Sequence, residues 1–476
     1  MSESTLLEEV EVRGRTYREW LRGREVTVVG LARSGIAAAQ LLVRLGARVT
    51  ATDAKPLTGL GTDVAKLGGL GVRLYVGGHP PEAFGDAGLV VVSPGVPAAH
   101  PVLASLRGLG VPVIGELELA WRVMEAEVIA ITGTNGKTTT TALTGALLRE
   151  QVRPVLVGGN IGTPLSAHAL DFPADGIVVA EVSSFQLESI ETFHPRVAAV
   201  LNLTPDHLDR HGSLDAYVAA KTRIFENQTQ ADCAVLNLDD PLAASLVDHT
   251  KAGVVFFSRT RPLEHGVSCK DGWIVARLNG HQEPICPLSE IFLRGQHNVE
   301  NVLAASACAL WTGMPAAAIR RAIVAFRAVP HRLEWIRDIR GVAYYNDSKG
   351  TNVASTVRAL ESFTESVILI AGGQGKGQDF TPLAGTAGGR VRLAILIGED
   401  RPKIQQALAA AAIPTLSADS MEQAVRLARA AARPGEVVLL SPACASFDMF
   451  EDFEHRGEAF REAVLALPAN GAGESR

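Results

Sequence analysis

A strand that runs into a glycine loop and then directly into a helix constrains this chain more than any other stretch. Residues 127–148 read EVIAITGTNGKTTTTALTGALL, an apolar and β-branched run followed by two glycines and a helical pattern. Gly133 and Gly136 let backbone N–H groups turn inward, Lys137 supplies a charge for the β- and γ-phosphates, and Thr138 offers a hydroxyl to Mg²⁺. The stretch predicts an ATP or GTP site.

The loop departs from the full pattern G-x-x-x-x-G-K-[ST] at its first position. Ile131 stands where that pattern has glycine, so only the shorter G-x-x-G-K-T is present. The alternative is a glycine turn between a strand and a helix, with a solvated lysine. The periodicity on both sides favours the phosphate loop.

The length of the chain indicates more than one domain. Its 476 residues exceed what one hydrophobic core usually serves, which predicts three domains. Hydrophobic residues make up 47% of the chain, charged residues 20% and aromatic residues 5%, a composition typical of α/β enzymes with sheets covered on both faces.

Charge, cysteines and hydropathy narrow the class of protein further. The formal net charge of −6 argues against nucleic-acid binding and against affinity for anionic membranes. Five scattered cysteines without C-x-x-C spacing argue against a zinc site or a disulfide framework. The acidic N-terminus has no apolar leader, and no run of 18 apolar residues occurs. We expect a cytoplasmic protein without membrane insertion.

The first section begins as strand, helix and strand. Gly30 and Gly35 follow the first strand, and Asp53 ends the second, where it can reach a ribose hydroxyl or a base edge. Ala32 replaces the second glycine of a dinucleotide fingerprint, and its Cβ would crowd a pyrophosphate. We expect a nucleotide-shaped pocket that is not for NAD, with the loop at Ser93–Gly95 able to approach its ligand; a purely structural turn is the alternative.

Further strands of the central section also end in polar residues. Glu181 closes the apolar run from Ile177, and Asp206 and His207 follow the run from Val197. In a mostly parallel sheet these loops gather at one edge with Lys137. A carboxylate there is costly to bury without a cation, so Glu181 indicates Mg²⁺ beside the phosphates, with a plain salt bridge as the alternative.

His207 has several possible roles on residue chemistry alone. It can be a zinc ligand, a general base, a Mg²⁺ ligand or a hydrogen-bonded loop histidine. Zinc needs more His or Cys at ligand spacing, and Mg²⁺ prefers oxygen. The choice stays open at this level.

The third section again reads as a small doubly wound sheet. Its strands end in polar or glycine turns that carry Arg332, Asp347, Lys349 and Lys376. Each lysine alone is usually a solvated charge. Together, basic and acidic turns suggest closure over ATP and a second, anionic substrate, as in a ligase or kinase.

Short motifs lie along nearly the whole chain, at Gly133–Thr138, Gly159–Gly162, Glu181–Glu188, Asp206–Arg210, His297 with Asn298 and Asn301, His331–Arg332, Asn346–Asn352, Leu440–Asp448 and Phe453–Gly457. Together these blocks resemble the Mur ligases of peptidoglycan synthesis. The last two blocks are most similar to the members that add D-glutamate, whereas the phosphate loop is shared with other Mur ligases and with folylpolyglutamate synthase.

The resemblance implies an α/β chain of three domains. They are a Rossmann-like domain at 1–115 that binds the UDP substrate, a central P-loop ATPase-type domain with a parallel sheet at 116–328, and a Rossmann-like domain at 329–476 that binds the amino acid. It also implies the reaction: ATP phosphorylates the L-alanine carboxylate of UDP-N-acetylmuramoyl-L-alanine, and the amine of D-glutamate attacks the acyl phosphate.

The resemblance assigns roles residue by residue. It implies two Mg²⁺ ions held with Thr138, Glu181, His207 and Lys221, the last as a carbamylated lysine, and catalytic roles for Lys137, Glu181, His207, Lys221 and Lys349. The implied ATP-binding residues are Gly133, Thr134, Asn135, Gly136, Lys137, Thr138, Thr139, Asn301, Arg332 and Asp347.

The other two substrates take the remaining positions. The residues implied for the UDP substrate are Gly30, Ala32, Arg33, Ser34, Asp53, Ser93, Pro94, Gly95, Asn160, Ser183 and Gln186. Those implied for D-glutamate are Lys349, Thr351, Lys376, Ser446, Phe447 and Phe453; paired lysines suit its two carboxylates.

Two rival functions remain at this level. A ligase adding L-glutamate to a folate leaves the uridine-like first domain without a purpose. A regulatory protein that hydrolyses ATP without ligation is the rival of a different class. We expect a monomer that uses ATP, Mg²⁺, UDP-N-acetylmuramoyl-L-alanine and D-glutamate.

Overall fold

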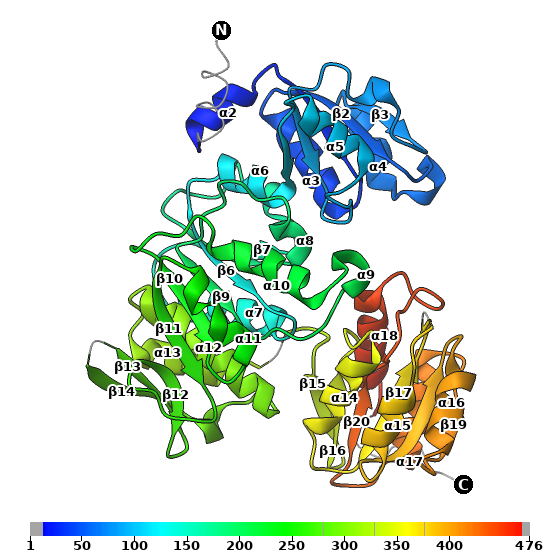
Figure 1. Cartoon of the computed structure of the whole chain (residues 1–476). Helices are drawn as coiled ribbons and strands as arrows, with labels where there is room; N and C mark the ends of the chain where they lie inside the picture. The colour runs from blue at the N-terminus through cyan, green and yellow to red at the C-terminus, as the bar shows by residue number, and fades with distance from the viewer. Residues whose placement is uncertain (1–12, 279, 328, 376, 469–476) are drawn as a thin grey trace. The chain divides into compact units, whose positions relative to one another are not determined.

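The computed structural model describes residues 13–468, apart from 279, 328 and 376. The chain folds into two compact units that meet in sequence near residue 324, and residues 291–299 belong to the second unit. Figure 1 labels the elements, and the first unit holds two of the three sheets.

The first sheet is parallel throughout, with the strand order β3-β2-β1-β4-β5. Valine-rich strands form its middle, and β4 is buried along its whole length. The chain order reverses between β1 and β4, which is where open α/β sheets place their ligands. The strands are β1 (Glu25–Val29), β2 (Arg48–Asp53), β3 (Arg73–Val76), β4 (Leu89–Val92) and β5 (Val113–Gly115).

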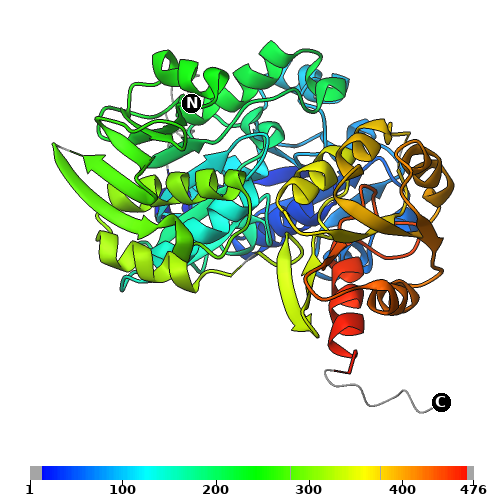
Figure 2. The same ribbon diagram turned by 90° about the horizontal axis from the view of Figure 1, so that it is seen from below.

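The central sheet has nine strands in the order β14-β13-β12-β11-β10-β9-β6-β8-β7. All pairs from β7 to β12 are parallel, and β13 and β14 add an antiparallel edge that the sequence did not predict. This edge lies at one side of the unit in Figures 1 and 2. The strands are β6 (Glu127–Thr132), β7 (Val155–Gly159), β8 (Ile177–Glu181), β9 (Val197–Val200), β10 (Cys233–Asn237), β11 (Gly253–Ser258), β12 (Gly266–Lys270), β13 (Trp273–Leu278) and β14 (His281–Pro287).

The second unit is built on six strands in the order β15-β16-β20-β17-β18-β19. Alternate residues of β17 enter different cores: Leu369 packs in one and Ile368 and Ile370 in the other. A strand buried on both faces is typical of a doubly wound sheet. The strands are β15 (Glu334–Ile339), β16 (Val342–Asn346), β17 (Val367–Gly372), β18 (Val391–Ile397), β19 (Thr415–Ser417) and β20 (Val437–Leu440). Only β15 runs antiparallel to its neighbour among these described strands.

Helices connect the parallel strands, and several begin with a side-chain cap. Ser213, Asn352 and Ser420 each accept a hydrogen bond from a backbone N–H in the first turn of the helix that follows. In the first unit the helices are α2 (Arg15–Leu21), α3 (Arg33–Arg44), α4 (Thr62–Gly69), α5 (Pro101–Gly108), α6 (Glu116–Val123), α7 (Lys137–Leu148), α8 (Ser184–Leu187), α9 (Leu208–His211), α10 (Leu214–Thr222) and α11 (Pro241–Ser245). Helices α12 (Gln296–Trp311) and α13 (Ala316–Ala325) each span a sequence border between the units. The second unit also holds α14 (Val353–Glu361), α15 (Thr381–Ala387), α16 (Arg401–Ala409), α17 (Met421–Ala431) and α18 (Phe453–Leu465).

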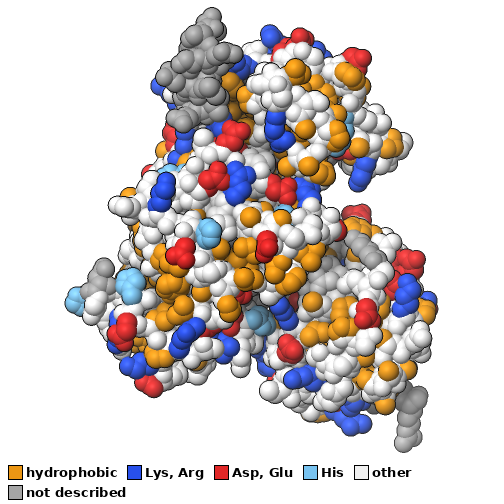
Figure 3. Space-filling model, in the orientation of Figure 1, with side chains coloured by type: hydrophobic (Ala, Val, Ile, Leu, Met, Phe, Trp, Pro, Cys, Tyr) orange, Lys and Arg blue, Asp and Glu red, His pale blue; other side chains and the backbone are white. Residues whose placement is uncertain are grey.

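The predicted fold class is confirmed: three α/β sheets follow one another along the chain. The borders at 115 and 328 stay predictions. Within residues 13–468, no helix has both the length and the apolar character needed to cross a membrane. Basic and acidic side chains are interspersed on the face drawn in Figure 3.

Candidate active site

The predicted phosphate loop lies between β6 and α7. Gly136 has φ 83° and precedes the first residue of the helix, so the loop turns at a conformation that favours glycine. The side-chain nitrogen of Lys137 donates to the carbonyl oxygens of Gly133 and Thr134, both at 2.8 Å. Thr138 is buried in the first turn of α7. The helix N-terminus and the lysine lie together at this turn, as a phosphate cradle requires, and nucleotide binding by these residues stays a prediction.

The loop is fastened to the segment after β9. The backbone N–H of Thr134 donates to the carbonyl oxygen of Asn202 at 2.8 Å, and that of Asn135 donates to the Asn202 side-chain oxygen at 2.8 Å. The Thr134 hydroxyl is 3.0 Å from the hydroxyl of Tyr217. Sequence analysis assigned no role to Asn202 or Tyr217. The position of Asn202 directly after an apolar strand was the signal available for it.

Asn301 comes to the loop from α12, 165 positions further along the chain than Gly136. It accepts a hydrogen bond from Thr140 at 3.2 Å. A Cβ on Gly136 would stand 2.3 Å from its side-chain oxygen. The predicted ATP-binding residues Thr139 and Asn301 are both buried beside the loop.

Lys221 is buried against the same loop. Its side chain is 1% exposed, and its nitrogen donates to the hydroxyl of Thr132 at 3.2 Å and to the carbonyl oxygen of Gly133 at 3.0 Å. Burial lowers the pKa of Lys221 well below its usual value, and the charge of Lys137 lowers it further, against the opposing effect of Asp206 and Glu181. Lys137, Asp206 and Glu181 therefore all lie within electrostatic reach of Lys221.

Glu181 ends β8 as a buried carboxylate with one oxygen bonded. Its Oε1 accepts a hydrogen bond from the Asn160 side chain at 2.7 Å. Its Oε2 is buried and has no hydrogen-bond partner among the described residues. A buried carboxylate oxygen without a donor suits a cation. Among the described residues Glu181 forms no salt bridge, which was the alternative to a metal ion that the sequence left open.

His207 precedes the short helix α9 in a left-handed backbone conformation, with φ 51°. Its Nε2 lies 3.7 Å from Asp206 Oδ2, and its ring centroid is 4.8 Å from that of Phe185. Both Asp206 and His207 are substantially exposed. The structure leaves this imidazole at the surface of the phosphate-loop edge, where a ligand can reach it.

The described residues hold no group of three His, Cys, Asp or Glu side chains arranged as a metal shell. A Mg²⁺ ion in a nucleotide site takes one or two protein oxygens and completes its shell with phosphates and water. Glu181 and the Thr138 hydroxyl at the helix start fit that requirement.

A cavity of about 660 Å³ lies at the switch point of the first sheet and extends to the central domain. Loops after β1, β2 and β4 line it together with residues that follow β7 and β8. It includes all but one of the residues predicted for the UDP substrate. They are Gly30, Ala32, Arg33, Ser34, Asp53, Ser93, Pro94, Gly95, Asn160 and Gln186.

Ser183 is the predicted residue that does not line this cavity. Its hydroxyl caps α8 by accepting from the backbone N–H of Gln186 at 3.3 Å, while the Gln186 side-chain oxygen accepts from the Ser183 backbone at 2.9 Å. This reciprocal pair fixes the first turn after Glu181. Gln186 reaches the cavity from that turn.

Asp53 braces the glycine turn of the first sheet. One carboxylate oxygen accepts from the backbone N–H of Leu31 at 2.7 Å and the other from that of Lys55 at 2.8 Å. The hydroxyl of Ser93 donates to the carbonyl oxygen of Gly30 at 2.8 Å and joins the loops after β1 and β4. Lys55 and His79 also line the cavity, and the sequence reasoning missed both.

In the second unit, the predicted residues follow neighbouring strands. β16 leads into Asp347, Lys349 and Thr351, and β20 leads into Ser446 and Phe447, so both groups lie at the carboxyl edge of one sheet. Arg456 joins these loops: its buried guanidinium donates to the Ser348 hydroxyl at 3.0 Å, the Ser348 carbonyl at 2.8 Å and the Cys444 carbonyl at 3.0 Å.

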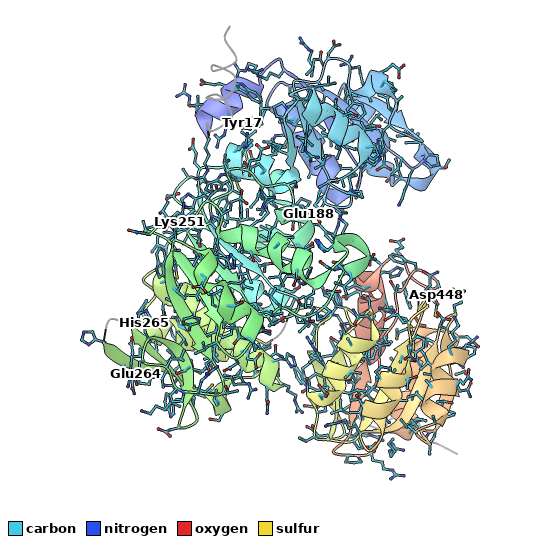
Figure 4. All side chains as sticks on the ribbon, in the orientation of Figure 1. Tyr17, Glu188, Lys251, Glu264, His265 and Asp448 are labelled. Atoms are coloured by element: carbon cyan, nitrogen blue, oxygen red, sulfur yellow. The ribbon has the colours of Figure 1, made fainter. Side chains whose placement is uncertain are left out.

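Side chains at this edge differ in exposure. The nitrogen of Lys349 lies 5.5 Å from the ring centre of Phe453. Ser446 is buried, whereas Phe447 is 63% exposed. Asp448, labelled in Figure 4, accepts a hydrogen bond from the backbone of Glu399 at 2.8 Å. Lys376, predicted to bind D-glutamate, lies outside the described residues.

Asp347 is buried beside Arg332. It accepts hydrogen bonds from the Ser441 hydroxyl at 2.7 Å and from the Leu333 backbone at 3.3 Å. Burial raises the pKa of Asp347 to about 6, although Ser441 and the charge of Arg332 oppose the shift. Arg332 Nε is buried without a hydrogen-bond partner among the described residues.

Comparisons with known proteins cover the three sheets in turn. Residues 24–115 match the N-terminal domain of MurD-like Mur ligases, residues 131–309 the Mur ligase middle domain, and residues 331–444 the glutamate ligase domain of Mur ligases.

Relatives match over almost the whole length. The UDP-N-acetylmuramoylalanine–D-glutamate ligase of Pelotomaculum thermopropionicum is 48% identical over 446 residues, covering 93% of this chain and 98% of the relative. The ligase of the same name from Acidobacterium capsulatum is 48% identical over 448 residues, covering 94% and 97%.

A solved structure, the UDP-N-acetylmuramate–alanine ligase of Thermotoga maritima, shares the fold with a TM-score of 0.59 at 20% identity, over 93% of this chain and 99% of that one. The sequence matches go further than the fold. The chain belongs to the Mur ligase family, in the group of the UDP-N-acetylmuramoylalanine–D-glutamate ligases.

Proposed function

We propose that the chain is an ATP-dependent ligase that joins D-glutamate to UDP-N-acetylmuramoyl-L-alanine and releases ADP and phosphate. One observation carries the proposal: a phosphate loop and a separate nucleotide-shaped cavity occur in the same compact unit, with Asn160 common to the cavity and to Glu181 at the loop edge. A regulatory ATPase would not need the second cavity. A ligase that adds L-glutamate to a folate would not need a nucleotide pocket on the first sheet.

The cavity supports binding of the UDP substrate. Loops after the first-sheet strands present glycine backbone and Arg33 and Lys55 to its interior, which suits a diphosphate. Asn160 and Gln186 enter from the central domain and suit the amide-bearing end of the substrate. In this proposal the muramoyl-alanine end lies toward the central domain, to which ATP is also assigned.

The phosphate loop supports binding of ATP through Gly133, Gly136, Lys137 and Thr138. Glu181 and Thr138 would hold Mg²⁺, which when bound would neutralise charge on the phosphate oxygens. His207 is a further ligand candidate because it ends the neighbouring segment in an exposed position. Two ions are the proposal.

Lys221 is proposed to be carbamylated. Its lowered pKa favours the neutral amine, and a neutral amine can attack CO₂ to give a carbamate and a proton. The product carries oxygens, which Mg²⁺ prefers to nitrogen. The buried contacts with Thr132 and Gly133 place this group beside the phosphate loop.

The reaction proceeds in two steps in this proposal. A carboxylate oxygen of the L-alanine attacks the γ-phosphorus of ATP, and the bond to the β-phosphate oxygen breaks to release ADP. The amine of D-glutamate then attacks the acyl carbon, a tetrahedral intermediate forms, and phosphate leaves as the amine loses a proton. Lys137 and Lys349 are proposed to hold the developing negative charge.

Residues of the second unit are proposed for the remaining contacts. Lys349, Thr351, Lys376, Ser446, Phe447 and Phe453 are assigned to D-glutamate, and Arg332 and Asp347 to ATP. The carboxyl edge shared by Lys349 and Ser446 supports the first group. A monomer in the cytoplasm, without membrane insertion, with domains at 1–115, 116–328 and 329–476, completes the proposal.

The test is phosphate release from ATP with each substrate omitted in turn. We expect release only when UDP-N-acetylmuramoyl-L-alanine and D-glutamate are both present, with a product whose mass equals the substrate plus one glutamyl residue. Release without either substrate would support the regulatory ATPase instead. Equal use of L-glutamate would remove the assigned specificity, and turnover of a folate would support the rival ligase.

A further inference from the structure

Arg210 of the central domain contacts the loop after β4, residues 94–96, which lines the cavity and which we call its lip. Its guanidinium lies 3.5 Å from the carbonyl oxygen of Gly95, 3.4 Å from that of Pro94 and 3.3 Å from that of Val96, all of which belong to residues that line the cavity. It also donates to Glu188 Oε2 at 2.6 Å. One side chain therefore bridges the first-domain loop after β4 and the end of α8.

The position of Arg210 is fixed on several sides. Its guanidinium carbon lies 4.6 Å from the ring centre of Phe185, and its side chain is only 15% exposed. Glu188, labelled in Figure 4 beside α8, is 18% exposed. A partly buried, stacked and charge-paired arginine is held far more firmly than a surface arginine with a single partner.

The lip has a second anchor at its other end. Ser93 is held by its hydroxyl bond to Gly30, and the backbone N–H of Val96 closes a turn onto the Ser93 carbonyl at 2.9 Å. These contacts leave the carbonyl groups of the turn facing Arg210. Ser93 and Arg210 together determine where the lip stands over the cavity.

Arg210 lies on the same short helix that His207 begins. Helix α9 is held on α8 by His211, whose Nε2 lies 3.0 Å from the Ser184 hydroxyl and whose Nδ1 lies 3.5 Å from Glu188. Helix α8 in turn follows Glu181 and carries Gln186 into the cavity. A shift of α9 would therefore move His207 and would also change the contacts of Arg210 with the lip.

We propose that Arg210 is a positioning residue. It fixes the position of the lip of the UDP-substrate cavity and keeps the segment that begins at His207 in a fixed place relative to that lip. The proposal rests on the proposed function. Arg210 acts through the carbonyls of Pro94, Gly95 and Val96 and through Glu188, without a contact of its own to the reacting atoms.

Lysine cannot replace this arginine. A guanidinium has five N–H donors in a rigid planar fork, so it can serve carbonyl oxygens and a carboxylate while its face packs on Phe185. An ammonium group can keep the ion pair with Glu188, yet it loses the planar stacking and most of the carbonyl contacts. Arg210→Lys thus separates the bridge from the charge.

The experiment measures binding of UDP-N-acetylmuramoyl-L-alanine by calorimetry without ATP and without Mg²⁺. We expect Arg210→Lys and Arg210→Ala to weaken binding by about tenfold, because each lost polar contact of this kind is worth about 1 kcal/mol. In steady-state assays, we expect the KM for this substrate and the Mg²⁺ half-saturation to rise, with the KM for ATP at saturating Mg²⁺ unchanged.

Arg44→Ala is the matched control. Arg44 also joins the first domain to the central domain, through Asp171 at 2.7 Å, but its side chain is 48% exposed and neither residue lines the cavity. We expect wild-type affinity from this variant. Thermal unfolding of every variant checks that the fold is kept.

A double-mutant cycle tests whether Arg210 and Glu188 act together. If Arg210 acts through Glu188, Glu188→Gln weakens binding too, and combining it with Arg210→Ala adds little. Wild-type affinity and Mg²⁺ dependence in a folded Arg210→Lys chain would overturn the inference. If the wild-type chain itself fails to bind the UDP substrate, the proposed function fails instead, so the two failures are distinguishable.

Discussion

The side-chain nitrogen of Lys221 lies 3.0 Å from the carbonyl oxygen of Gly133, the first glycine of the phosphate loop. A buried ammonium ion beside a second lysine is unfavourable, which explains why the pKa of Lys221 falls well below its usual value. This lowered pKa favours the neutral amine, which is the form that the proposed carbamate requires.

Lys221→Ala is expected to lose most ligase activity and to regain part of it with added short carboxylic acids. The truncated side chain leaves a space beside Thr132 and Gly133 in which a free carboxylate can supply the missing oxygens. The measurement is the ligation rate against concentration of formate or acetate. Lys251→Ala, an exposed lysine labelled in Figure 4, is the control and should neither lose activity nor respond.

Absence of rescue in a folded Lys221→Ala chain would count against the carbamate. Removal of dissolved CO₂ gives an independent check on the wild-type chain. Activity should fall as CO₂ is depleted and return when bicarbonate is added, since carbamate formation is reversible. Constant activity under both conditions would assign Lys221 a different role.

The phosphate loop and the first-domain cavity were predictable because their signals are local. A strand, a glycine turn and a helix within 22 residues place Gly133, Gly136 and Lys137 whatever the rest of the chain does. Parallel topology then brings Glu181 and Asp206 to the same edge, since the carboxyl ends of parallel strands meet there. The pattern of apolar runs was enough for both steps.

Contacts between distant segments were not predictable in the same way. The bridge from Arg210 to the lip joins residues separated by about 115 positions, and neither motif shows which of its side chains turns toward the other. The edge strands β13 and β14 were missed because their half-exposed pattern is weak next to the buried parallel strands. The sequence motif assigned Ser183 and Gln186 to the substrate and did not show that they form the N-terminal cap of α8.

Glu181→Gln is expected to raise the Mg²⁺ half-saturation of ligation by roughly 10- to 100-fold. The amide keeps the size of the side chain and one oxygen for Asn160, but it removes the negative charge that makes the unpartnered Oε2 a cation ligand. The measurement is the ligation rate at a series of Mg²⁺ concentrations. Glu127→Gln, at the exposed start of β6 and paired with Arg153, is the matched control. Equal Mg²⁺ dependence in both variants would exclude Glu181 as a ligand.

Gly136→Ala is expected to impair ATP binding and stability together. A left-handed conformation costs an alanine about 1 kcal/mol, and here the added Cβ also stands 2.3 Å from the Asn301 side-chain oxygen. Gly110→Ala is the control, because Gly110 has φ 78° with no atom near its Cβ position. We expect a KM for ATP raised at least about tenfold in the first variant and unchanged in the second. Equal unfolding midpoints for the two variants would show that the loop accommodates the added methyl group without loss of stability.

Asp347→Asn is expected to change how stability depends on pH. Burial raises the folded pKa of Asp347 to about 6, above the value of about 3.9 in an unfolded chain. The folded chain therefore holds the proton more tightly, and the stability that the protonated form provides is lost as pH rises from about 4 to about 6. The asparagine variant has no proton to release. Its unfolding free energy relative to wild type should rise by about 1.4 kcal/mol between about pH 5 and about pH 7.5.

Urea unfolding at several pH values measures this difference for the transition that includes the second unit. Asp338→Asn, the same substitution at an exposed position of the neighbouring strand β15, serves as the control. Ligase activity is expected to fall in Asp347→Asn while stability at neutral pH improves, since the buried carboxylate is assigned to ATP. A stability difference that runs the other way with pH would mean that Arg332 and Ser441 outweigh burial, and that Asp347 stays ionised throughout.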